Sequence, residues 1–133
     1  MRSPQIGKAS MNTTKVTKTK AAHLRSGELA EQRACDFLLS NQFTLVERNF
    51  RCPHGELDLI MREGETLVII EVRFRKNAKY GSALESVTAS KQAKLIATTE
   101  FYLNTLTSDM PAIRFDVIGI SGEGELQWVQ NAF

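Results

Sequence analysis

Residues 54–74, with the sequence HGELDLIMREGETLVIIEVRF, constrain the fold more than any other stretch of this chain. Two apolar runs, residues 56–62 and 66–74, flank a short break. Each run is too short for an independent helix, and the second is rich in β-branched residues, so the stretch predicts a β-hairpin. A glycine at the first position of a two-residue loop, here Gly64-Glu65, is typical of a type II′ turn.

This loop sets a hairpin register in which the numbers of two opposed residues add up to 129. Asp58 then lies opposite Glu71, and Glu56 lies opposite Arg73, with opposed Cβ atoms about 5 Å apart. Two like charges at that distance repel, and a carboxylate inside an apolar run is costly unless something neutralises it. A divalent cation, which prefers hard oxygen ligands, would neutralise the pair, and so would Arg73 together with solvent. Spacing alone therefore leaves a metal site and a partly exposed acidic pair as two open interpretations.

The length of 133 residues is enough for one domain with a proper core. The longest unbroken apolar run, residues 67–70, is too short for a transmembrane helix, and the N-terminus lacks the apolar segment of a secretory signal. We therefore expect a cytoplasmic protein without membrane association, in which Cys35 and Cys52 stay reduced. Because no CxxC or HxxxH spacing of a zinc site is present, we interpret His54 as a loop residue near the carboxylates.

The net charge of +2 conceals an uneven distribution. Residues 1–25 hold six of the seventeen basic residues and none of the fifteen acidic ones, and we expect residues 1–22 to form a disordered basic arm before a single domain over 23–133. Residues 73–94 carry six basic residues and only Glu85 as an acid. Such a stretch is either a phosphate-binding surface or a solvated face. The residues that we expect to contact nucleic acid are Arg75, Lys76, Lys91 and Lys94.

Apolar spacing outside the hairpin predicts two helices and three further strands. One helix covers residues 27–40 with Ser26 as its N-cap, and the other covers 88–104, capped by Thr88 or Ser90. The further strands lie at residues 42–51, 114–120 and 125–131. The order α-β-β-β-α-β-β predicts an α/β fold, because a crossover helix places the fourth strand parallel to the third in a mixed central sheet.

The motifs of this chain resemble those of the YraN family of small bacterial proteins. The matching stretches are SGELAEQRACDFL, NFRCPHGELDLIMREG, LVIIEVRFR, YGSALESVTASKQAKL, IRFDVIGI and WVQNAF. They cover most of residues 26–133 in order and with compatible spacing. YraN proteins are similar to Holliday-junction resolvases and restriction endonucleases of the PD-(D/E)XK superfamily. The resemblance implies a restriction-endonuclease-like core, DNA as the partner, and phosphodiester cleavage that depends on Mg²⁺ or Mn²⁺.

The resemblance also assigns roles by position. Asp58 and Glu71 correspond to the two metal-binding carboxylates, and Arg73 stands where the superfamily has its signature lysine. Glu28, which spacing alone marks as a favourable first-turn acid, corresponds to the acid of the first helix, and Lys91 to the basic position on the second. An arginine is a poor proton-transfer group because its guanidinium stays protonated in proteins. It can still hold a phosphate by bidentate hydrogen bonds.

We therefore expect a Mg²⁺-dependent DNA endonuclease that acts on branched DNA, with Asp58, Glu71, Arg73 and Glu28 as catalytic residues. Two alternatives stay open: a non-catalytic nucleic-acid-binding module with a nuclease-like fold, and a protein-interaction domain whose paired acids are structural. A branched substrate has two equivalent strands, which a homodimer would suit, although no segment marks an interface.

Overall fold

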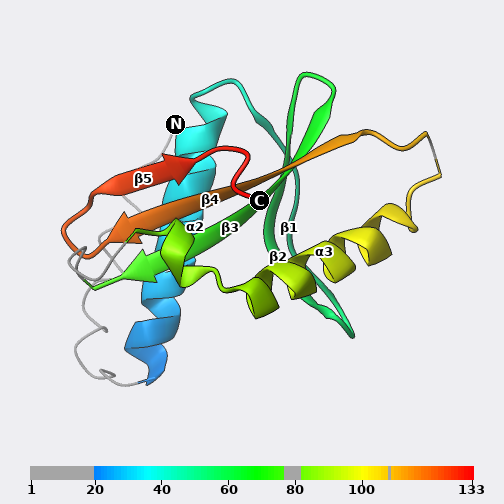
Figure 1. The fold of residues 1–133 in the computed structure, drawn as a ribbon. Helices are drawn as coiled ribbons and strands as arrows, with labels where there is room; N and C mark the ends of the chain where they lie inside the picture. The colour runs from blue at the N-terminus through cyan, green and yellow to red at the C-terminus, as the bar shows by residue number, and fades with distance from the viewer. Residues whose placement is uncertain (1–19, 77–81, 108) are drawn as a thin grey trace.

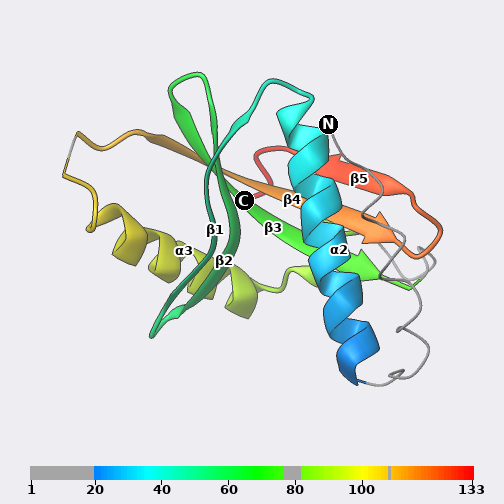
Figure 2. The same cartoon turned by 180° about the vertical axis from the view of Figure 1, so that it is seen from behind.

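The computed structural model describes residues 20–76, 82–107 and 109–133, and in them it shows a five-stranded sheet between two helices (Figures 1 and 2). The strands are β1 (Thr44–Cys52), β2 (Gly55–Glu63), β3 (Thr66–Arg75), β4 (Ala112–Ser121) and β5 (Leu126–Val129), in this order across the sheet. All neighbouring pairs are antiparallel except β3 and β4, which are parallel. The predicted element order and mixed sheet are thus confirmed, and a short 3₁₀ helix, η2 (Leu84–Ser86), is added before the second helix.

The first helix, α2 (Lys20–Leu39), begins earlier than predicted. Ser26 lies inside it and is not its N-cap, because the preceding residues include Lys, Ala, Leu and Arg, which are strong helix formers. Residues 20–22, which we assigned to the arm, belong to this helix, and residues 1–19 lie outside the described part. The second helix, α3 (Ala89–Leu103), begins after Thr88, whose side chain caps it as predicted. No helix in the described residues is both long and apolar enough to cross a membrane.

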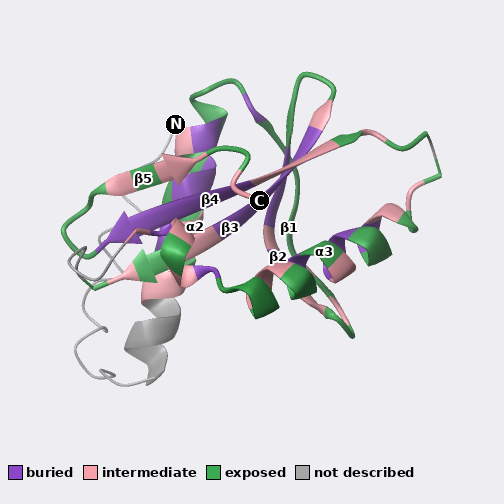
Figure 3. Ribbon diagram, in the orientation of Figure 1, coloured by how far each residue is buried: buried purple, intermediate pink, exposed green. Residues whose placement is uncertain are grey.

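The buried side chains form two apolar layers, one on each face of the central strands. Figure 3 shows that β3 and β4 are buried over much of their length. The layer under α2 includes Ala34, Leu38, Leu59, Val68 and Ile118. The layer under α3 includes Leu57, Ile69, Leu95, Tyr102 and Val117. Because β3 is central and covered on both faces, its first half is a continuous apolar run and does not alternate with polar residues.

The β2–β3 hairpin has the predicted register over the five residue pairs from the turn to Leu59 opposite Ile70. Gly64 has a φ of +61° and Glu65 is not among the residues with positive φ, as the predicted type II′ turn requires. The ladder ends at the Leu59–Ile70 pair, although both strands continue. Beyond it β2 stays paired with β1 and β3 with β4, so the two halves of the sheet separate as a fork (Figures 1 and 2).

Candidate active site

Asp58 lies at the base of this fork, and the chain is locally irregular around it. Its Oδ2 accepts a hydrogen bond of 2.9 Å from the backbone N–H of Val72 on β3. Asn49, the β1 residue level with Asp58, has a positive φ of 55°. Leu57 and Leu59 pack in opposite apolar layers although they are two residues apart, so the regular alternation of the strand is broken between them. The break turns the Asp58 carboxylate into the gap between β2 and β3.

Glu71 is the second acid of the fork, and it is only 4% exposed. Two cations compensate its charge: Arg73 Nη1 lies 3.6 Å and Lys91 Nζ lies 3.7 Å from its Oε2. Burial raises the pKa of Glu71 above its ordinary value, whereas the charges of Lys91 and Arg73 and a hydrogen bond with Asp58 act in the opposite direction. Asp58 and Glu71 therefore lie close together, but they are past the end of the ladder, so their predicted pairing as directly opposed residues is not part of it.

The pKa of Asp58 is raised to about 8, first by burial and then by the charge of Glu71. The hydrogen bond from Val72 lowers the pKa, and the charges of Glu31 and Glu56 raise it further. When only Arg73 and Lys91 are nearby as cations, the Asp58–Glu71 pair therefore retains a proton at neutral pH. A divalent cation would compete with that proton for the same oxygens.

Arg73 is fixed between the acid pair and η2. Its Nη2 donates a hydrogen bond of 2.7 Å to the carbonyl oxygen of Ser86, while Nη1 faces Glu71. Among the residues that the structure describes, its Nε is the one buried side-chain nitrogen or oxygen without a hydrogen-bond partner. An unpaired buried donor costs about 1–3 kcal/mol, so this nitrogen is available to an acceptor that the protein itself does not supply.

Glu56 does not lie opposite Arg73, so that part of the predicted register is wrong. Its Oε2 instead lies 3.4 Å from Arg51 Nε and 3.4 Å from the side-chain amide nitrogen of Asn49. The reason is the fork: β2 has separated from β3 before Glu56 is reached, so this acid faces its β1 neighbours.

The acid of α2 whose charge acts on Asp58 is Glu31, not Glu28. Glu31 Oε1 accepts a hydrogen bond of 3.1 Å from the Asn49 side chain, which ties α2 to β1 beside the fork. Glu28, three residues earlier on the same helix, is exposed, and its catalytic role stays a prediction. Spacing could have drawn attention to Glu31, because residues three apart share a helix face.

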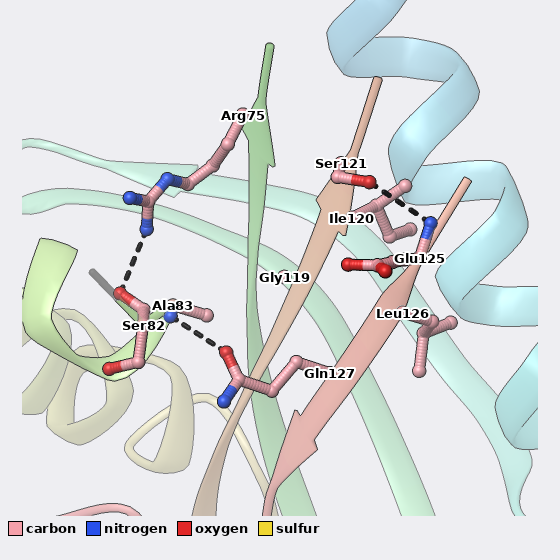
Figure 4. Close-up of a pocket in the computed structure, with 9 residues that line it drawn as sticks. All are labelled: Arg75, Ser82, Ala83, Gly119, Ile120, Ser121, Glu125, Leu126 and Gln127. Atoms are coloured by element: carbon pink, nitrogen blue, oxygen red, sulfur yellow. Dashed lines mark hydrogen bonds between the residues drawn. The ribbon is translucent and has the colours of Figure 1, made fainter. Parts of the chain in front are cut away.

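The four predicted nucleic-acid contacts fall in two places. Lys91 and Lys94 lie on α3, where Lys91 reaches the acid pair and Lys94 is exposed. Arg75 and Lys76 lie at the far end of β3, where Arg75 lines a cavity of about 470 Å³ between β3, β4, β5 and the residues before η2 (Figure 4). Arg75 Nη1 donates a hydrogen bond of 2.8 Å to the carbonyl oxygen of Ser82 there. Of these four residues, Lys91 contacts the acid pair, whereas Arg75 contacts Ser82 and lines the cavity.

The donor set fits a hard cation with few protein ligands. In the described part of the chain, no group of three or more His, Cys, Asp or Glu side chains is arranged to hold a metal ion. Asp58 and Glu71 offer two carboxylates, and a cation held by them would take its remaining ligands from water. That is the binding mode typical of Mg²⁺, which keeps several waters and takes one or two protein carboxylates.

Another buried acid, Asp116, provides the contrast of a structural carboxylate. It is 1% exposed and its two oxygens accept four hydrogen bonds. Arg114 donates two of 2.9 Å, the indole N–H of Trp128 one of 2.9 Å, and the backbone N–H of Asn131 one of 3.0 Å. Protein donors thus fully satisfy Asp116, whereas the Asp58–Glu71 pair combines two acids with raised pKa values.

The fold and the acid pair define an α/β protein with a candidate cation site at a fork of its sheet, and comparison with known proteins places it in a family. The sequence model of the uncharacterised protein family UPF0102 matches residues 30–120. A UPF0102 protein of Nitrosomonas eutropha is 50% identical over 107 residues, covering 80% of this chain and 91% of the relative. One of Nitrosococcus oceani is 44% identical over 117 residues, covering 85% and 94%. The chain belongs to the UPF0102 (YraN) family, which confirms the resemblance seen in its motifs.

Proposed function

We propose that this protein is a metal-dependent endonuclease that hydrolyses phosphodiester bonds in DNA, with Asp58 and Glu71 as ligands of Mg²⁺ or Mn²⁺. The observation that carries the proposal is the pair itself: two adjacent carboxylates, both with raised pKa values, inside the fork. Two acids placed together in a poorly solvated position hold back a proton, which a divalent cation can replace. Strongly perturbed acids with a specific charge partner are typical of functional sites.

The chain holds both carboxylates in place before any ligand arrives. The Val72 N–H orients Asp58, and Arg73 and Lys91 hold Glu71 from two different elements. When bound, a divalent cation supplies Lewis-acid activation of a water molecule and neutralises negative charge on the phosphate. The fork therefore needs little rearrangement to accept its ligands.

The two cations beside Glu71 are the groups that would bind the phosphate. The side chains of Arg73 and Lys91 are 30% and 35% exposed, whereas that of Glu71 is 5% exposed, so a phosphate can reach both cations without uncovering the acid. Arg73 serves as a clamp, because its guanidinium does not transfer protons near neutral pH. Lys91 reaches Glu71 from α3, and its ammonium group would hold the phosphate from an element other than that of Arg73.

A second candidate function, a non-catalytic nucleic-acid-binding module, is favoured by one observation. Arg73 stands where the superfamily resemblance has a lysine, and its Nη2 is already committed to the Ser86 carbonyl oxygen. Such a site can retain a phosphate through charge alone while turnover is lost. The basic residues of α3 would then serve binding only.

Cleavage of a panel of end-labelled DNAs by the full chain tests the proposal and separates the two functions. The panel contains single-stranded, duplex and four-way branched DNA, each with Mg²⁺, Mn²⁺ or EDTA. We expect cleavage with either metal and none with EDTA. Binding to DNA without cleavage under any condition would favour the non-catalytic module. Absence of both binding and cleavage would favour a protein-interaction domain.

A further inference from the structure

A stripe of side chains on α3 leads from the acid pair to the turn between β1 and β2. Lys91, Lys94 and Phe101 lie on one side of the helix, and Thr98, between them on the same side, is fully buried against the β1–β2 turn. Lys91 marks one end of the stripe by its contact with Glu71. The stripe is about 15 Å long at the helical rise, which corresponds to roughly four stacked nucleotides.

The other end of the stripe is an aromatic pair open to solvent. The rings of His54, in the β1–β2 turn, and Phe101 lie 5.9 Å apart between centroids at an interplanar angle of 63°. Phe101 is 40% exposed and His54 is also exposed, while Phe50 lies beside Phe101 with a centroid distance of 6.3 Å. The pair therefore has an apolar support on the protein side and free ring surface on the other.

The turn that carries His54 is seated firmly on α3. Gly55 has a φ of +151°, and a Cβ at this position would come within 3.0 Å of Thr98 Oγ1. Only glycine allows this approach without strain, so the turn and the helix meet through backbone and the Thr98 side chain. The relative position of His54 and Phe101 is thus set before any partner binds.

We propose that His54 and Phe101 form a stacking platform for an unpaired base of a nucleic acid whose backbone follows Lys94 and Lys91 to the acid pair. The exposed lysines attract an anionic backbone, and base–aromatic stacking is the recurring way in which proteins hold single strands. In a duplex the base faces are already covered by their neighbours, so this platform selects an unpaired or splayed base. The inference rests on the proposed function and names its substrate class: DNA with an unpaired nucleotide roughly four nucleotides from the phosphate that is cut.

The test measures equilibrium binding by fluorescence anisotropy in EDTA, where no cleavage takes place. The probes are a labelled single strand, a duplex with a single-stranded overhang and a blunt duplex of the same sequence. The variants of the full chain are Phe101→Leu, which keeps apolar packing but removes the aromatic face, and Phe101→Trp, which restores it. The matched control is Ile96→Ala, because Ile96 is 42% exposed on the same helix but lies outside the stripe.

Phe101→Leu should weaken binding of the single strand and the overhang by about 5- to 100-fold and leave the blunt duplex unchanged. Phe101→Trp and Ile96→Ala should bind all three probes like the wild type. The platform is overturned if Phe101→Leu weakens all probes equally, if it weakens none, or if the wild type binds no nucleic acid. A change in self-association alone, seen by sedimentation, would also overturn it and assign the face to a second copy of the chain.

This measurement is independent of the acid pair. A protein that cleaves DNA in Mg²⁺ but shows no effect of Phe101→Leu would retain the proposed function and lose the platform. A protein that binds single strands through Phe101 but never cleaves would retain the platform and lose the nuclease.

Discussion

The carboxylate of Asp58 accepts a 2.9 Å hydrogen bond from the backbone N–H of Val72 where the ladder between their strands has ended. A side-chain oxygen thus replaces an acceptor that the neighbouring strand no longer supplies. The same carboxylate lies against Glu71 and has a raised pKa. Asp58 therefore accepts a hydrogen bond within the sheet and is also one acid of the candidate site. A substitution that keeps the hydrogen bond but removes the charge distinguishes these two roles.

Asp58→Asn should make the metal-free protein more stable at neutral and alkaline pH. Asparagine keeps an oxygen for the Val72 N–H but removes an ionisable group whose pKa is about 8 in the folded protein against an ordinary 3.8. A raised folded-state pKa gives stability that is present below the ordinary pKa and is lost as the pH rises through the folded value. Wild-type stability should therefore fall between about pH 4 and about pH 8, and the fall should be smaller in the variant.

Urea denaturation in EDTA at several pH values measures this effect. We expect Asp58→Asn to exceed the wild type by on the order of 1 kcal/mol at about pH 9, and by less at about pH 5. A variant that is equally destabilised at every pH would show that Asp58 acts only as a hydrogen-bond acceptor in the sheet.

Cation binding should release a proton and should tighten as the pH rises. Because Asp58 retains its proton up to a pKa of about 8, Mn²⁺ must displace that proton at lower pH. The apparent affinity should rise by up to about tenfold per pH unit below that value and level off above it. Calorimetry in two buffers with different ionisation enthalpies counts the released protons. An affinity that does not change with pH would remove Asp58 from the ligand set.

Arg73→Ala should slow cleavage by about 10²–10³-fold, whereas Arg73→Lys should retain or raise activity. Alanine removes the phosphate clamp and one of the two cations that compensate Glu71. Lysine is the residue that the proposed superfamily resemblance implies at this position, and it keeps the charge, although it loses the hydrogen bond to Ser86. Single-turnover cleavage with excess enzyme compares the variants, and thermal melts check their folding. If Arg73→Ala cleaves as fast as the wild type, the assigned role of Arg73 is wrong.

Lys91→Gln and Lys94→Gln should differ although both remove one charge from α3. Each should lower the slope of log affinity for DNA against log salt concentration by about 1. Only Lys91→Gln should also raise the pKa of Glu71 further, because Lys91 lies 3.7 Å from that acid. Salt titrations of DNA binding, combined with Mn²⁺ titrations, measure both effects. An unchanged slope in the double variant would make this side of α3 an ordinary solvated face.

Asp116→Asn should destabilise the protein by about 3–5 kcal/mol and leave the Mn²⁺ affinity of the folded protein unchanged. The new amide group would face the buried donors of Arg114 and Trp128, which both require an acceptor. Thermal melts and Mn²⁺ titration at a temperature where the variant is folded test this. A loss of cation binding equal to that of Asp58→Asn would contradict the division between site acid and structural acid.

The proximity of Asp58 and Glu71 could be predicted from the sequence because a single feature determines it. The two-residue loop at Gly64 sets the register, and strand pairing carries that register to the end of the ladder. The end of the ladder could not be predicted, since nothing in the sequence pattern shows that the Asp58 side chain takes the place of a backbone acceptor for the Val72 N–H. The expected Glu56–Arg73 pairing failed for this reason.

Which residues surround Asp58 and Glu71 could not be predicted from the sequence, because it depends on how the helices pack on the sheet. Lys91 lies in the first turn of α3, but only the packed fold shows that it contacts Glu71 on β3. The start of α2 was misjudged because Ser26 is a good N-cap residue, whereas the preceding segment also favours a helix. Helical spacing likewise does not show which acid of α2 faces Asp58.

The most direct test of the account compares single-turnover DNA cleavage by the wild type, Asp58→Asn and Glu71→Gln, purified identically, in Mg²⁺ and in Mn²⁺. We predict cleavage by the wild type in both metals, a loss of at least about 10²-fold in each variant, and unimpaired DNA binding by all three proteins in EDTA. Equal cleavage by the wild type and both variants would show that the activity comes from a contaminant. That result would contradict a catalytic role for the acid pair at the fork of the sheet.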